Sequence, residues 1–246
     1  MSENDEHRRL RASANAAVMK LGSSCTVEQA IAHTRAWLDE LRRGGFAELI
    51  ERSYGADAQV IEPGPGGYDE VRLQAVEAEL GLALPPSYRR FLHTSGQVTF
   101  LNSWRDQTTA LEKLVERSRA LETGILEIHA RSPLVRAMGD QLRVIRFCDY
   151  QNYSGEWMYL ANARDAYGES PALLWFKSPK LAAARDQFIG TLRRDGRPGH
   201  GRLPALASRP RESRFQPRLF DTFESWLAGH TETLIEGVAN QLAAGL

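Results

Sequence analysis

The side chains that most often carry enzyme chemistry are scattered along this sequence. The two cysteines, Cys25 and Cys148, lie far apart, and neither belongs to a CxxC pair or to a cluster with histidine. The histidines show no HxH or HxxxH spacing and occupy positions 7, 33, 93, 129, 200 and 230. Because protein zinc sites draw three or four such ligands from short spacings, the sequence predicts no metal site.

No nucleophile motif stands out either. Ser95 and Ser154 each precede a single glycine, which does not make the GxSxG elbow of a hydrolase. The glycine-rich stretches match neither a Walker loop nor the dinucleotide-binding fingerprint. Cys148 and Asp149, with His129 upstream, could supply a nucleophile and a base, but nothing in the sequence brings them together, and a structural cysteine is favoured. We therefore expect no catalytic residues, no cofactor and no enzyme activity.

The bulk composition is that of a chain that folds around its own core. With 246 residues and 42% hydrophobic residues, it has the length of one large domain or two small ones. No apolar run approaches the roughly 20 residues of a membrane span, and the first residues lack the apolar core of a signal peptide. Two distant cysteines suit a reducing compartment. We expect a cytoplasmic protein without a membrane span.

The most strongly patterned stretch runs from Tyr68 to Gly96 and predicts two helices joined at a corner. Leu73, Val76 and Leu80 recur at helical spacing, with Val71 and Ala75 beside them, so the first helix should bury this stripe.

The chemistry of the joint between these helices is equally specific. Gly81 follows the last periodic leucine, where a helix favours a residue that tolerates a left-handed backbone. The pair Pro85 and Pro86 then restarts the chain in a first helical turn. The second helix repeats apolar or small residues at helical spacing and ends at Gly96; they are Tyr88, Phe91, Leu92 and Ser95.

This corner resembles the opening of the SUKH superfamily, which includes fungal regulators of cell-wall synthesis and many bacterial immunity proteins. The residues that carry the resemblance are Val76, Glu77, Leu80, Gly81, Leu84, Pro85, Tyr88, Phe91, Leu92 and Gly96. The family usually shows Asn-Gly after the second helix, where this chain has Ser95-Gly96-Gln97. The acidic Glu77 suits a cap or a salt bridge better than a catalytic acid.

The resemblance implies an α+β fold in which helices pack on one side of an antiparallel sheet. We expect a flexible N-terminus over residues 1–24, a helical extension over 25–55 and a SUKH-like domain over 56–246, with insertions at about 97–139 and 193–218. The extension should begin at the capping box of Thr26 and Gln29. A closing helix should start near Phe220 and continue to the end of the chain.

Within that domain, residues 142–148, 157–160 and 172–176 are rich in branched and aromatic side chains and predict an antiparallel meander. The 97–139 insertion should hold a helix that starts at Thr109 and stops before Gly124, then a short helix after Ser132. Residues 181–192 are compatible with a helix. The insertion is either a partner-specific surface or added packing over the core, and packing is favoured.

The resemblance also implies a job done by binding. The commonest role assigned to bacterial members is that of a cytoplasmic immunity protein, which binds a cognate toxin and blocks its active site. The alternative for this chain is a regulatory or scaffolding interaction module without a toxin partner. A toxin gene beside this one would favour immunity, and a pocket with converging titratable groups would indicate an enzyme. The expected partner is thus a cognate protein toxin or effector, without a cofactor, a membrane or nucleic acid.

For an immunity protein, the hairpin that joins the first two strands is the preferred contact with the toxin. Aromatic side chains anchor such interfaces and carboxylates steer a basic partner. The candidate partner-binding residues are Asp149, Tyr150, Asn152, Tyr153, Glu156 and Trp157. Alternatively, Trp157 and Tyr159 belong to the core of the sheet and only the turn is exposed. The double variant Tyr153→Ala and Glu156→Lys should be tolerated by the fold.

Residues 193–218 contain eight arginines against Asp195 and Glu212, which predicts either an anion-binding segment or a solvated loop. The loop is favoured because the chain as a whole has a formal net charge of zero. We expect the purified protein to show no tight binding to DNA or RNA in a titration from low to physiological salt. Tight binding that falls steeply with salt would instead indicate phosphate contacts.

Overall fold

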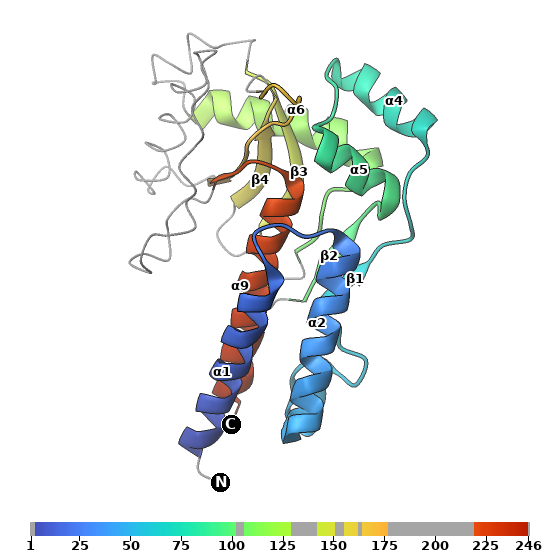
Figure 1. Cartoon of the computed structure of the whole chain (residues 1–246). Coiled ribbons are helices and arrows are strands. Elements are labelled where there is room, and N and C mark those ends of the chain that lie inside the picture. The colour runs from blue at the N-terminus through green and yellow to red at the C-terminus, as the bar shows by residue number, and fades with distance from the viewer. Residues whose placement is uncertain are drawn as a thin grey trace. The chain divides into compact units, whose positions relative to one another are not determined.

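The computed structural model describes residues 3–101, 106–128, 142–150, 155–161, 164–176 and 219–245 (Figure 1). The chain divides into two compact units, and each unit draws on separate stretches of sequence. Unit 1 comprises Met1–Gly67, Thr94–Gln107 and Phe223–Leu246; unit 2 comprises Tyr68–His93 and Thr108–Thr222. The predicted boundary near residue 56 is therefore wrong, because the last helix belongs with the N-terminal helices and not with the sheet.

Helix α2 (Val27–Leu41) of unit 1 begins at the predicted capping box. The Gln29 amide donates to Thr26 Oγ1 at 3.3 Å, and the Thr26 amide donates to Gln29 Oε1 at 2.9 Å. A π-helical segment, η1 (Arg42–Phe46), follows, and Gly45 takes a positive φ of 97° there before α3 (Ala47–Tyr54) begins. The predicted helical pair over 25–55 is confirmed.

The first helix contradicts the prediction of a flexible N-terminus. Helix α1 (Glu3–Leu21) buries Leu10, Ala14, Ala17 and Leu21, which recur at helical spacing. This stripe packs beside α9 (Phe223–Ala244) in unit 1, as Figure 1 shows. The small alanines give the stripe a weak hydrophobic signal, which is why the sequence pattern did not reveal it.

Two side chains of α1 also tie it to the helices that follow. Arg9 donates to the carbonyl of Gly44 at 2.7 Å, and its guanidinium lies over the ring of Phe46. Ser13 Oγ accepts a hydrogen bond from Trp37 Nε1 at 3.1 Å. The amide of Cys25 donates to the carbonyl of Glu224 at 3.2 Å, which joins the end of the α1–α2 connection to the start of α9.

Helix α9 forms the centre of unit 1. Its buried residues are Phe223, Trp226, Leu227, Ala228, His230, Thr231, Leu234, Ile235, Val238, Ala239, Leu242 and Ala243. Phe100 lies in a short two-stranded sheet of β1 (Ile61–Pro63) and β2 (Val98–Phe100). Its ring centroid is 5.9 Å from that of Trp226 and 4.5 Å from that of His230. Residues 98–100 were expected to lie in an insertion without a strand, and β2 corrects that expectation.

Unit 2 is built on a four-stranded antiparallel sheet in the order β3-β4-β5-β6. The strands are β3 (Val144–Tyr150), β4 (Gly155–Leu160), β5 (Ala172–Phe176) and β6 (Leu219–Phe220). Ile145 pairs with Tyr159, and Trp157 pairs with Leu174. The predicted meander of three strands is confirmed, and β6 extends it.

The proline corner is formed as the sequence predicts. Helix α4 (Glu70–Leu80) is capped by Asp69 and ends at Gly81, whose φ is 66°. Helix α5 (Pro86–Thr94) follows the two prolines. The relative exposures of Leu80, Leu84, Tyr88, Phe91 and Leu92 are 3, 2, 0, 4 and 0%. The expected fold class, with helices packed on an antiparallel sheet, is confirmed.

The apolar stripe of α4 is narrower than predicted. Leu73 and Leu80 are buried, whereas Val71 is 76% exposed and Ala75 is exposed. Helix α5 makes the closer contact with the sheet. The ring centroid of Tyr88 lies 5.7 Å from that of Phe147 and 5.5 Å from that of Tyr159.

Helix α6 (Leu111–Ile128) covers the free edge of β3. Ser118 Oγ accepts the amide hydrogen of Arg146 at 3.1 Å, and Glu122 Oε1 accepts that of Val144 at 2.9 Å. The predicted helix is thus confirmed, but it continues through Gly124. Covered edge strands cannot pair with another chain, so this part of the 97–139 insertion provides packing. The helices predicted after Ser132 and over 181–192 lie outside the described residues, as does the 193–218 segment.

The burial of Phe91 allows a direct test of this fold. Phe91 stacks on Tyr88 with a centroid distance of 5.8 Å. We expect Phe91→Ala to lower the free energy of unfolding by about 3 to 5 kcal/mol, through lost burial and a residual cavity. Val71→Ala on the exposed face of α4 should change it by less than about 0.5 kcal/mol. Urea unfolding of both variants gives the comparison, and equal stabilities would contradict the buried position of Phe91.

Candidate functional site

The hairpin between β3 and β4 was the preferred partner-binding site, and the structure describes only part of it. Asp149 pairs with Glu156 and Tyr150 pairs with Gly155 next to the turn, while the register shifts between Arg146 and Cys148. Asn152 and Tyr153 lie outside the described residues, as do the side chains of Asp149 and Tyr150. Their proposed contact with a partner stays a prediction.

The other two candidate residues of the hairpin are buried. Glu156 is 7% exposed and Trp157 is 4% exposed. The ring of Trp157 lies 5.7 Å from that of Phe220 in β6, and Tyr159 is fully buried against Phe147. Glu156 and Trp157 are successive residues of β4 and therefore point to opposite faces of the sheet, so their burial shows that both faces are covered at this point. The alternative interpretation, in which Trp157 and Tyr159 belong to the core, is the correct one, and Glu156 and Trp157 are not surface contacts.

Glu156 faces a buried arginine on the neighbouring strand. Its Oε2 atom lies 3.5 Å from Nε of Arg146, which is 5% exposed. Burial lowers the pKa of Arg146 from its ordinary value, the Glu156 carboxylate opposes this shift, and Arg117 adds to it. If one member of a buried ion pair were removed, the other would be left as an uncompensated charge in the interior, which is strongly destabilising. Glu156 therefore stabilises the sheet from within and is not free to steer a partner.

Glu77, the acidic residue among those that carry the SUKH resemblance, has a structural role in the corner. Its Oε1 atom accepts the amide hydrogen of Leu84 at 2.8 Å and lies 3.3 Å from Nε of Arg89. Arg89 also donates to Glu70 at 2.5 Å. The prediction of a cap or a salt bridge is confirmed.

Neither cysteine is placed as a reactive group. Cys148 is fully buried in β3, and its suggested partner His129 lies outside the described residues. Burial, followed by the charges of Glu224 and Glu232, raises the pKa of Cys25 to about 12. A thiol with a raised pKa is a poor nucleophile. Within the described ranges, no three acidic, histidine or cysteine side chains cluster in a way that could hold a metal ion.

A turn between β4 and β5 was not identified from the sequence, although several hydrogen bonds fix its conformation. We call residues 164–169 the Asp165 turn. Asp165 Oδ1 accepts the amide hydrogens of Tyr167 at 2.8 Å and of Glu169 at 2.9 Å. The Asp165 carbonyl accepts from Gly168 at 3.1 Å, and Gly168 has a φ of 80°. Asp at the first position and Gly at the fourth are typical of such turns, so Asp165-Ala-Tyr-Gly168 is the signal that could have revealed it.

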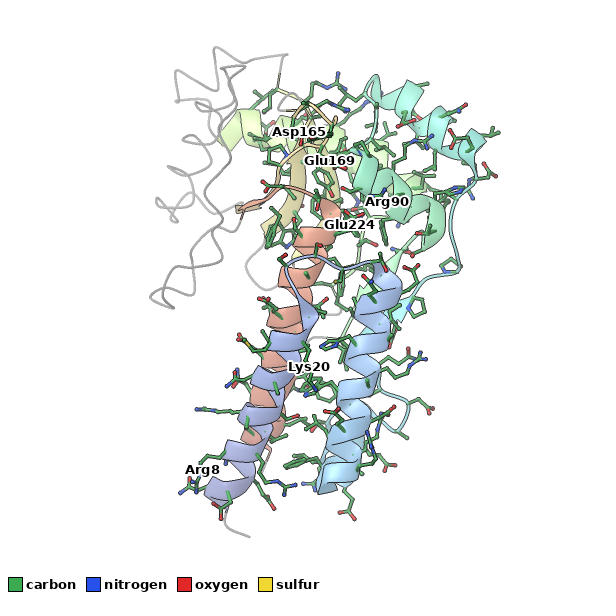
Figure 2. The ribbon with its side chains drawn as sticks, viewed as in Figure 1. Arg8, Lys20, Arg90, Asp165, Glu169 and Glu224 are labelled. Carbon is green, nitrogen blue, oxygen red and sulfur yellow. The ribbon has the colours of Figure 1, made fainter. Side chains whose placement is uncertain are left out.

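The Asp165 turn is also fixed to the proline corner. The carboxylate of Glu169 accepts two hydrogen bonds from Ser87, one from its amide and one from its hydroxyl, both at 2.7 Å. Arg164 donates to the carbonyls of Ala161, Gly168 and Ala83. Figure 2 labels Asp165 and Glu169 in this part of the molecule. Tyr167, which lies between them in the sequence, is 85% exposed.

The buried pair of Arg146 and Glu156 reverses the earlier expectation for Glu156→Lys. A lysine there would bury a second cation beside Arg146, so we expect a loss of about 3 to 5 kcal/mol of folding free energy. Glu116→Lys, at an exposed position of α6, is the matched control and should change stability by less than about 0.5 kcal/mol. Urea midpoints measure both effects. An unchanged midpoint for Glu156→Lys would mean that this carboxylate is not held in the interior.

Comparison of this chain with protein-family models finds no match, and comparison with curated proteins finds none either.

Proposed function

We propose that the chain is a cytoplasmic immunity protein that binds a cognate toxin or effector protein and blocks its active site. The proposal rests on the resemblance of the proline corner to the SUKH superfamily. The observation that carries it is the way in which this chain uses the residues of the motif. Each motif residue whose contacts are described serves the architecture of the corner.

The apolar members of the motif form the buried side of the corner, and Gly81 and Glu77 close its backbone. Leu80, Leu84, Tyr88, Phe91 and Leu92 are buried. The amide of Gly81 donates to the carbonyls of Glu77 and Ala78, and the Glu77 carboxylate accepts from Leu84. Because the motif residues hold the corner together, they leave the exposed surface to carry the function. That pattern suits a binding protein better than an enzyme whose motif supplies reacting groups.

The charge distribution supports a protein partner. The formal net charge of zero creates no general attraction to nucleic acid. Many charged side chains in unit 2 are already paired, for example Arg72 with Glu112 and Arg89 with Glu70. Within the described residues, no helix has the length and hydropathy needed to cross a membrane. A toxin-binding surface of standard size would need about 800 Å² on this chain.

The test is functional and uses the neighbouring genes. Each reading frame adjacent to this one is expressed alone and together with this chain, and growth is measured. We expect one neighbour to arrest growth alone and to be neutralised by co-expression, with the two proteins co-purifying at a Kd on the order of nanomolar or tighter.

The control is an unrelated toxin of similar potency, which this chain should not neutralise. A neighbour that is harmless but still co-purifies would replace immunity by a regulatory or scaffolding role. A neighbour that is toxic and unaffected by this chain would overturn the proposed function.

A further inference from the structure

We propose that the Asp165 turn is the contact surface of this protein, with Tyr167 as its anchor and a basic surface of a partner protein as its occupant. This inference rests on the proposed function, because it names the site and the partner chemistry that the function requires. It also moves the site away from the β3–β4 hairpin, where Glu156 and Trp157 are buried.

The first support is the exposure of Tyr167. Among the described residues, the large hydrophobic side chains that stand out in solvent are Met19, Val71 and Tyr167, and Tyr167 is the aromatic one. Other tyrosines of unit 2, such as Tyr88 and Tyr159, are fully buried. Exposed tyrosines contribute strongly at interfaces because they bury a large area with few rotatable bonds.

The second support is that the turn is already fixed before any partner arrives. Asp165 holds the amides of Tyr167 and Glu169 from inside the turn. Glu169 and Arg164, at the two ends of the turn, attach it to the proline corner through hydrogen bonds with Ser87 and with the carbonyl of Ala83. Binding to an ordered loop loses less conformational entropy than binding to a mobile one. Burial of Tyr167 by a partner would therefore contribute to affinity with little loss from ordering the turn.

The third support is the apolar surface beside the turn. A methyl group built on Gly168 would lie 3.7 Å from Cγ of Pro86, so the turn sits against the proline ring. Pro86 and Ala83 are themselves exposed. The turn and the corner thus present Tyr167, Pro86 and Ala83 on neighbouring segments. Aromatic residues are enriched in the buried centre of protein interfaces.

The charge of the surroundings defines the occupant. Asp221 is exposed, and its pKa is raised by partial burial and by the nearby Asp165 carboxylate. These two acids therefore repel each other in the unbound protein. The one basic residue of the turn, Arg164, directs its guanidinium to backbone carbonyls. An Arg or Lys side chain of a partner would relieve the repulsion, which favours a basic partner surface.

The experiment uses the neighbouring gene product identified by the growth assay as the probe, purified in an inactive form. Its affinity and association rate are measured for the full chain and for Tyr167→Ala, Tyr167→Phe, Asp221→Asn and Val71→Ala. Val71 is the matched control because it is an apolar residue of unit 2 that is also largely exposed, at 76% against 85% for Tyr167, and lies on a different element, α4. Melting temperatures of the Tyr167 and Val71 variants should equal that of the wild type, since these side chains are exposed, and that of Asp221→Asn should equal or slightly exceed it, since this change removes the repulsion by Asp165.

We expect Tyr167→Ala to weaken binding by at least about 30-fold, the usual effect of an anchor residue. Tyr167→Phe should stay within about threefold because it keeps the ring, and Val71→Ala within about twofold. Asp221→Asn should slow association at low salt and reduce its dependence on ionic strength, because rim charges act mainly on encounter.

The outcomes separate the two proposals. If the wild type binds the probe and Tyr167→Ala binds equally well, the Asp165 turn is not the site, while the proposed function stands. Tight binding to a probe surface that is acidic, with no salt dependence, would overturn the basic partner. If the wild type binds no neighbouring gene product, both the site and the proposed function are overturned.

Discussion

Several backbone groups of the proline corner have no partner in the regular hydrogen bonding of α4 and α5, and unit 2 is organised around this constraint. Two consecutive prolines contribute no amide hydrogens, and the end of α4 and the start of α5 each leave polar groups unpaired. Side chains supply the partners, one from α4 itself and three from outside the corner. Glu77 accepts from Leu84, Arg143 donates to the carbonyl of Leu80, Arg164 donates to that of Ala83, and Glu169 accepts from Ser87. Three of these four side chains come from the sheet and its connections, so the corner and the sheet stabilise each other.

The same principle explains the sheet itself, where polar groups are paired across elements and not left to solvent. The amides of β3 that face away from β4 are accepted by α6, and the buried Arg146 lies beside Glu156 on the next strand. Both arrangements protect the sheet from water and from other strands. They also bury Glu156, which is therefore not available for contact with a partner. The proposed contact lies instead on the Asp165 turn, where the side chain of Tyr167 is 85% exposed.

The parts of the fold that the sequence predicts are those specified by neighbours in the chain. Gly81, Pro85 and the capping box of Thr26 act within a few residues, and the structure confirms each. The errors arise where the partner is remote. Ala14 lies on the stripe of α1 that packs on α9, Glu156 lies 3.5 Å from Arg146 on the neighbouring strand, and Glu169 of the turn bonds to Ser87, 82 positions away in the sequence. A single sequence does not reveal such pairs, because neither member carries a local signal of the other.

The packing of α1 on α9 has a consequence for the order in which the protein can fold. About 200 residues separate the end of α1 at Leu21 from the start of α9 at Phe223. At ribosomal rates of roughly 5 to 20 residues per second, α1 waits on the order of ten seconds or more for its partner. During that time its apolar stripe is open to other chains. Unit 1 can close only after all of unit 2 has left the ribosome. The folding of unit 1 therefore depends more on chaperones or on fast late assembly than the folding of a unit made from one continuous segment would.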